Sequence, residues 1–214
     1  MKYLFLSVFA VFASVHLYAS YICNKKLRNI TKPFLLTSLL GYYCFRADNV
    51  SLLVILALVT SWLGDVLLMG NGIKWFSAGG FSFWASHALF IATYCSLTDF
   101  SKVQTWHVVL LAAVFMIIVT IIFNRLKPYI PKVIFLPMAL YLYTNGMMNM
   151  FAYLRFISKS CMPALITAIG ALLFFLSDST LFFVRFKKDS IIKTHFIVML
   201  TYTIGEFLIV YGLT

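Results

Sequence analysis

The chain has 214 residues, of which 63% are hydrophobic and 11% are charged, and its mean hydropathy is +0.97. This composition excludes a soluble globular domain and is typical of a polytopic membrane protein. A net charge of +11 would favour a nucleic-acid partner in a soluble protein. Here the basic residues cluster in short connections between apolar segments, as in cytoplasmic loops, so we expect no nucleic-acid partner.

Eight apolar segments follow one another, each close to the roughly 20 residues that cross a bilayer. They lie at about 3–22, 33–46, 50–69, 76–98, 106–123, 133–154, 163–184 and 194–213. The second is short, and Pro33 suits its first helical turn, where a missing N–H costs nothing. The sequence therefore predicts an all-α polytopic membrane protein, with one domain over 1–214 and eight transmembrane helices in one bundle.

Lysine and arginine are distributed unevenly between the two sides of the predicted bundle. The first, third, fifth and seventh connections carry 12 of them, and the termini and the other connections carry 5. The positive-inside rule then predicts that both termini are non-cytoplasmic. The first segment follows Lys2 as in a signal peptide, but no good cleavage site precedes Tyr21, and we expect it to stay as a helix. A compact chain of this kind suits the inner membrane of a bacterium.

Three of the six acidic residues fall inside apolar segments: Asp65 in a Leu-Gly-Asp motif, Asp178 in a Leu-Ser-Asp motif, and Glu206 in the eighth segment. A carboxylate in the bilayer costs about 2.5–3.5 kcal/mol on insertion scales, so such residues usually serve a function. No basic residue lies well inside a segment to pair with either aspartate, and Arg185 can extend outward to the surface. The similar contexts of the two aspartates suggest two four-helix halves.

Further polar side chains can join these acids. Ser86 and His87 lie near the middle of the fourth segment, and Tyr141, Asn145 and Asn149 recur every four residues to form a polar stripe on the sixth. Such a stripe more often joins helices than binds ligands, and a single buried histidine is as often structural as functional. The supporting candidates are Ser86, His87, Tyr141, Asn145 and Glu206.

Motifs for metal or covalent chemistry are absent from the sequence. It has no HExxH or CxxC spacing and no pair of histidines at i, i+4, and its four cysteines are scattered, so we expect no metal ion and no other cofactor. Two carboxyl groups that meet in a dry pocket can share a proton, so that one acts as an acid and the other as a base. Paired carboxyls of this kind cleave bonds through cationic transition states in glycosidases.

Taken in order, the motifs resemble those of the YhhN-like lysoplasmalogenase family. The matching stretches are 63–65, 79–87, 170–179 and 202–209, and the resemblance covers essentially the whole chain. It implies an eight-span hydrolase that cleaves the vinyl ether bond of a lysoplasmalogen to a fatty aldehyde and glycerophosphocholine or glycerophosphoethanolamine. It also implies that Asp65 and Asp178 are the two essential aspartates, whereas the family more often has glutamine in the place of Glu206.

The resulting hypothesis is that one aspartic acid protonates the vinyl ether while the other carboxylate stabilises the cation and activates water. The sequence does not assign these two roles. The expected partners are a lysophospholipid substrate and the membrane lipids, with the phosphate near Lys74 or Arg185; the oligomeric state is open.

Two alternative functions remain. A proton-coupled transporter would use the buried acids as a proton relay, and a scaffold would use them to hold helices together. An intramembrane aspartyl protease would need a fuller motif on adjacent segments.

Overall fold

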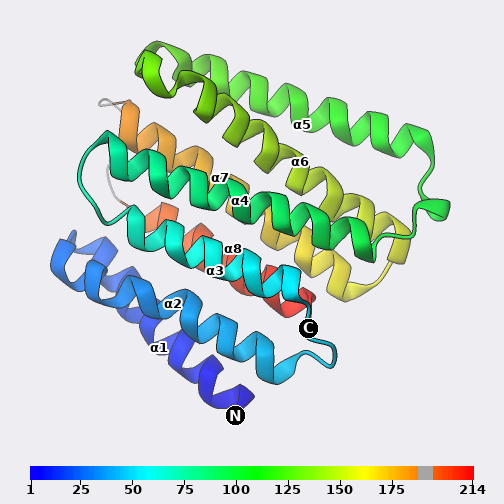
Figure 1. The fold of residues 1–214 in the computed structure, drawn as a ribbon, viewed down its shortest axis with the longest axis horizontal. Coiled ribbons are helices and arrows are strands. Elements are labelled where there is room, and N and C mark those ends of the chain that lie inside the picture. The colour runs from blue at the N-terminus through cyan, green and yellow to red at the C-terminus, as the bar shows by residue number, and fades with distance from the viewer. Residues whose placement is uncertain (188–194) are drawn as a thin grey trace.

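The computed structural model describes residues 1–187 and 195–214, and these residues form eight α-helices, three short 3-10 helices and no strand. The α-helices lie side by side (Figure 1). Their bounds are α1 Lys2–Tyr21, α2 Lys25–Arg46, α3 Leu52–Leu67, α4 Ile73–Leu97, α5 Thr105–Leu126, α6 Phe135–Lys159, α7 Met162–Phe186 and α8 Phe196–Gly212. The 3-10 helices are η1 Phe100–Lys102, η2 Lys127–Tyr129 and η3 Lys132–Ile134. The predicted all-α fold is confirmed.

Four helical segments within the described residues are long and apolar enough by themselves to cross a membrane: α1, α5 with η2, α7, and α8. The apolar helix α3 has 16 residues, which span about 24 Å at 1.5 Å per residue. The helices α2, α4 and α6 have the length but carry more polar side chains. The molecule is a helical membrane protein, and the crossing of the membrane by all eight helices stays a prediction.

The helix α2 begins at Lys25 and not at residue 33 as predicted. Asn24 caps it, because its side chain accepts a hydrogen bond from the backbone N–H of Leu27 (3.1 Å). Pro33 therefore lies inside the helix, where it removes one backbone donor, and not in the first turn. The first two turns are rich in lysine, arginine and asparagine, which made them resemble a loop in hydropathy. As a consequence Lys32 belongs to a helix.

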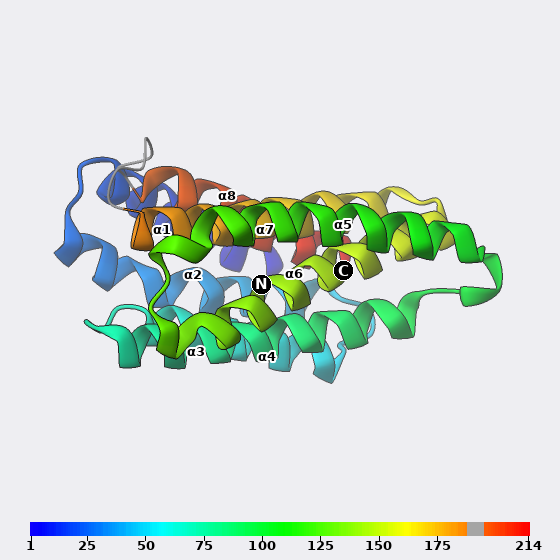
Figure 2. The same ribbon diagram turned by 90° about the horizontal axis from the view of Figure 1, so that it is seen from above.

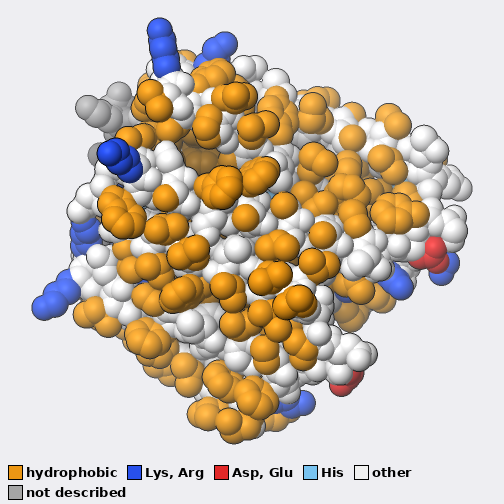
Figure 3. All heavy atoms as spheres, in the orientation of Figure 1, with side chains coloured by type: hydrophobic (Ala, Val, Ile, Leu, Met, Phe, Trp, Pro, Cys, Tyr) orange, Lys and Arg blue, Asp and Glu red, His pale blue; other side chains and the backbone are white. Residues whose placement is uncertain are grey.

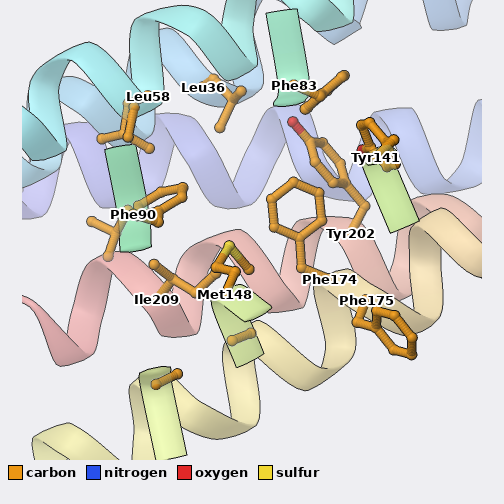
Figure 4. Close-up of a cluster of buried hydrophobic side chains, with 14 of the residues drawn as sticks. Leu36, Leu58, Phe83, Phe90, Tyr141, Met148, Phe174, Phe175, Tyr202 and Ile209 are labelled. Atoms are coloured by element: carbon orange, nitrogen blue, oxygen red, sulfur yellow. The ribbon is translucent and has the colours of Figure 1, made fainter. Parts of the chain in front are cut away.

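Packing joins the first four helices to the last four. The most extensive contacts are α7 with α8, α3 with α4, and α1 with α2, but α4 also packs on α6, and α8 touches α1 and α2. Figure 2 shows the same arrangement from above. Buried side chains from both groups form one continuous core, part of which Figure 4 shows. The two groups of four thus share a single interior.

Basic side chains gather at the end of the bundle where α2, α4 and α6 begin and α5 and α7 finish, hereafter the basic end. Figure 3 shows several of them along the left edge of the molecule. The described ones are Lys25, Lys26, Arg28, Lys32, Lys74, Arg125, Lys127, Lys132, Arg185 and Lys187. Lys188 and Lys193, which the charge count included, lie outside the described residues.

Candidate active site

A cavity of about 120 Å³ lies at the basic end, lined by residues of α1, α2, α3, α4, α7 and α8. Both aspartates that the sequence singled out line it. Asp65 lies in the last turn of α3 and is 2% exposed, and Asp178 lies two turns before the end of α7 and is 6% exposed. Two carboxyl groups that are distant in sequence therefore face one chamber.

Asp65 is held by an ion pair and a hydrogen bond. Its Oδ1 lies 3.0 Å from Nζ of Lys32 in α2, and its Oδ2 accepts a hydrogen bond from the hydroxyl of Tyr202 in α8 (2.8 Å). The Lys32 side chain is only 15% exposed, so water screens this pair little. The expectation that neither aspartate would have a basic partner inside a helix is therefore wrong. It failed because residue 32 was assigned to a connection.

A contact between α2 and α3 brings Lys32 opposite Asp65. The indole N–H of Trp62 in α3 donates to the carbonyl oxygen of Pro33 in α2 (3.1 Å). Trp62 precedes Asp65 by three residues, so the two side chains share a face of α3, and Pro33 directly follows Lys32. The contact that joins Trp62 to Pro33 thus sets the register of the ion pair.

Gly64 makes room for an aromatic ring next to Asp65. A Cβ atom on Gly64 would lie 2.5 Å from the ring of Phe83 in α4, so any larger residue would displace that ring. Phe83 is buried and lines the cavity. The glycine of the Leu-Gly-Asp motif therefore serves the close packing of α3 against α4.

Asp178 is held by the polar stripe of α6. Its Oδ2 accepts hydrogen bonds from the Tyr141 hydroxyl (2.6 Å) and from the Asn145 side-chain amide (2.7 Å). Nε2 of His87 lies 3.6 Å from the same oxygen, which is too long for a hydrogen bond. Asn149, the next member of the stripe, donates to Asn145. The structure therefore brings Tyr141, Asn145 and His87 to Asp178.

A layer of buried rings connects the side chains that hold the two aspartates. Phe174 of α7 packs edge-on against Tyr202 and His87, with ring centroids 5.5 Å and 5.1 Å apart, and His87 packs in the same way against Tyr141 at 5.0 Å. Figure 4 shows Tyr202, Phe174 and Tyr141 close together. Because packed rings resist displacement, this layer fixes the position of one hydroxyl donor relative to the other.

Two supporting candidates take other places. The Oγ of Ser86 donates to the carbonyl oxygen of Ala57 (2.9 Å) and lies 2.7 Å from the Oγ of Ser61, so Ser86 joins α4 to α3. Glu206 is buried in α8. Neither Ser86 nor Glu206 lines the cavity. Among the described residues, no three His, Cys, Asp or Glu side chains lie close enough together to hold a metal ion.

Basic side chains line the cavity around the aspartates. They are Arg28, Lys32 and Arg185, and the imidazole rings of His16 and His195 line the same cavity. The guanidinium group of Arg185 lies 5.4 Å from the centre of the Phe76 ring, a cation–π contact that restrains it at the rim. Lys74, the other residue expected near a phosphate, is exposed and does not line the cavity. Guanidinium groups recognise phosphate and carboxylate well, so this rim suits an anionic group.

Three residues of the site were missed by the sequence reasoning: Arg28, Lys32 and Tyr202. For the two basic residues the signal was Asn24, a good N-cap residue that would have started α2 before them. For Tyr202 the signal was its place one helical turn before Glu206, on the same face of α8.

This arrangement is suited to acid–base catalysis by two carboxyl groups next to an anion-binding rim. A family model, described as the YhhN family, matches residues 27–213, which is nearly the whole chain. The matched range contains every residue described around the cavity except His16. No curated protein and no solved structure matches the chain.

Proposed function

The chain belongs to the YhhN family, which is the lysoplasmalogenase family, and from this premise we propose that it hydrolyses the vinyl ether bond of a lysoplasmalogen. The products would be a fatty aldehyde and glycerophosphocholine or glycerophosphoethanolamine. The observation that carries the proposal is the shared cavity, because Asp65 and Asp178 line one chamber although they come from different helices. A lipid substrate is available to the site because the protein is a membrane protein.

The contacts of the two carboxyl groups support different roles for them. Asp65 faces the Lys32 ammonium group and accepts a hydrogen bond from Tyr202, and both interactions stabilise a negative charge. The described donors to Asp178, Tyr141 and Asn145, are uncharged and both reach Oδ2, which leaves Oδ1 to carry a proton. We therefore assign Asp178 as the general acid and Asp65 as the general base.

The reaction then runs in two stages with protons balanced. Asp178 gives its proton to the β-carbon of the vinyl ether, whose π electrons form the new C–H bond, and the Asp65 carboxylate stabilises the oxocarbenium ion. Water adds to the α-carbon and gives a proton to Asp65. When the hemiacetal collapses, Asp65 returns that proton to the leaving oxygen and Asp178 takes the hydroxyl proton. Aldehyde and alcohol are released, and both carboxyl groups regain their starting states.

The rim of the cavity supports a position for the headgroup. Arg28 and Arg185 line the same chamber as the aspartates and would bind the phosphate through charge-assisted hydrogen bonds. By the positive-inside rule the basic end would face the cytoplasm and both termini the other side. We propose the inner membrane of a bacterium as the location, with lysophospholipid and membrane lipids as the partners.

Aldehyde release by the purified protein tests the proposal. The wild type should release aldehyde from a lysoplasmalogen but not from its saturated ether analogue, which forms no oxocarbenium ion on protonation. Asp65→Asn and Asp178→Asn should each lower the rate by about 100- to 10,000-fold, the usual contribution of a general acid or base. Asp48→Asn is the matched control, because Asp48 is exposed in the connection between α2 and α3.

Full activity in either Asp65→Asn or Asp178→Asn, with the protein still in the membrane, would refute the assignment. The same preparation separates the two alternatives. Cleavage of a helical peptide in place of the lysolipid would favour a protease, and pH-driven solute uptake into vesicles would favour a transporter.

A further inference from the structure

An apolar cleft of about 270 Å³ lies between the first halves of α4 and α6, with α7 behind it. The residues that the argument uses are Phe76, Gly80 and Trp84 of α4, Met138 and Tyr141 of α6, and Phe182 of α7. On the face in Figure 3, a recess among hydrophobic side chains lies over the space between the beginnings of these two helices. The cleft is separate from the cavity that holds the aspartates.

The cleft is open toward the side of the bundle, where lipid surrounds the protein. Phe81 and Leu140 on its two edges are 69% and 54% exposed. At the end of the cleft farther from the basic end, the indole N–H of Trp84 donates to the hydroxyl of Thr144 (3.0 Å) and joins α4 to α6. From Phe76 to Trp84 the cleft follows about 12 Å of α4, at 1.5 Å per residue.

Two side chains connect the cleft to the candidate active site. Tyr141 lines the cleft, and its hydroxyl donates to Oδ2 of Asp178. Phe76 lines both the cleft and the cavity. A long molecule lying in the cleft would therefore contact Tyr141, whose hydroxyl is hydrogen-bonded to the general acid, and would face the bilayer along its side.

We propose that this cleft binds the alkenyl chain of the lysolipid, which slides in sideways from the bilayer between α4 and α6. The inference rests on the proposed function and adds a route and a binding site for the chain. One cleft takes one chain, which fits a lysolipid and not a two-chain phospholipid. Lipid tails are as apolar as the cleft, so a chain gains little hydrophobic energy by leaving the bilayer. The cleft therefore acts by aligning the chain so that its vinyl ether lies at Tyr141.

Gly80 offers a way to block the cleft without disturbing the helices. A Cβ atom built on Gly80 meets no other atom within 4 Å, so a larger side chain there extends into open space. Gly80→Leu and Gly80→Trp should fill the cleft in steps. Ile117→Trp is the matched control, because Ile117 is 59% exposed on α5 and lies outside the cleft.

Chain length is the first readout. With a hexadecenyl lysoplasmalogen, Gly80→Trp should lower kcat/KM by about 10-fold or more, the usual effect of steric mismatch in a hydrophobic pocket, and Gly80→Leu should lower it less. A water-soluble butenyl analogue does not need the cleft, so its hydrolysis should be unchanged, as should both substrates with Ile117→Trp. Equal rates of the wild type and both Gly80 variants on the long substrate would overturn the proposal. An equal loss on long and short substrates would also overturn it.

A second readout does not depend on activity. A trace of saturated-ether lysolipid with a brominated chain, added to vesicles of unbrominated lipid, should quench tryptophan fluorescence in the wild type. Trp84→Phe should remove that quenching, and Gly80→Leu, which blocks the cleft without adding a tryptophan, should reduce it. Quenching without aldehyde release would show that the cleft holds a chain while the proposed hydrolysis is wrong. Hydrolysis of the long substrate without quenching at Trp84 would overturn the cleft alone.

Discussion

Replacing Lys32 by methionine removes the ammonium group that lies 3.0 Å from Oδ1 of Asp65 and keeps an unbranched side chain of similar length. At this separation and an effective dielectric constant of about 20, the two charges attract each other by about 5.5 kcal/mol. Removing one member of a largely buried pair costs about 3–5 kcal/mol when the other stays charged. The cost is smaller if Asp65 takes up a proton, because no unpaired charge is then left buried.

A protonated Asp65 cannot serve as a base, so the variant should lose activity as well as stability. We expect the rate of aldehyde release by Lys32→Met to fall by about 100- to 10,000-fold at neutral pH, the usual contribution of a general base. Relative to the wild type at the same pH, the variant should regain part of the lost activity as the pH rises, because deprotonation restores the Asp65 carboxylate, whereas loss of the Asp178 proton affects both proteins. The measurement is a coupled aldehyde assay at several pH values, together with thermal unfolding in detergent.

Two further variants test whether the effect of Lys32→Met comes from its ion pair with Asp65. Lys26→Met removes an exposed charge from the same helix and should change neither rate nor melting temperature. The double variant Lys32→Met/Asp65→Asn has no charge left unpaired, so it should unfold at a higher temperature than Lys32→Met while staying inactive. If Lys32→Met kept the wild-type rate and melting temperature, the ion pair would have no part in the function and Asp65 would not be its base.

Three other substitutions test separate features. Tyr141→Phe removes one of two donors to Asp178 and should lower kcat by about 10-fold, or about 1.4 kcal/mol; an unchanged kcat would contradict the hydrogen bond. Arg155→Met removes the hydrogen bonds from α6 to α7 and to the end of α8, so it should lower the melting temperature but not the rate per folded molecule. Gly170→Ala would place a Cβ atom 2.7 Å from the Gly205 carbonyl oxygen and should cost about 1–3 kcal/mol of stability in detergent unfolding.

The helices could be predicted from hydropathy because most of them are apolar almost from end to end. The predicted segment 163–184 corresponds to α7 at Met162–Phe186, and 106–123 corresponds to α5 at Thr105–Leu126. The start of α2 could not be found in this way, since its first two turns are polar and face the cavity and the basic end. A helix whose beginning lines a polar cavity loses the hydropathy signal on which the prediction depends.

The aspartates could also be found from the sequence, because a carboxyl group in an apolar segment is conspicuous wherever it folds. The partners of Asp65 could not be found in this way. Tyr202 lies 137 residues from Asp65, and its place one helical turn before Glu206 indicates a buried face of α8 but not which carboxyl group it meets. The stripe of Tyr141 and Asn145 was visible, but whether it joined helices or met a carboxyl group depended on which face of α6 turned toward α7. The face of α6 that turns toward α7 is determined by the packing of the helices.

The position of the aspartates relative to the cavity at the basic end and the apolar cleft has a physical rationale. In a lysoplasmalogen the vinyl ether lies where the apolar chain meets the polar glycerophosphate. Carboxyl groups much deeper in the bundle would require the phosphate to enter apolar surroundings, which costs far more than the interactions gained there. Carboxyl groups at the surface would require the chain to leave the bilayer, at about 0.8 kcal/mol per methylene. Asp65 and Asp178 lie below the basic rim, and Asp178 is bonded to Tyr141 in the wall of the apolar cleft. Under the proposed function, a substrate with its vinyl ether between the cavity and the cleft would have its phosphate among arginines and its chain among aromatic rings, so that neither part would be transferred into an unfavourable environment.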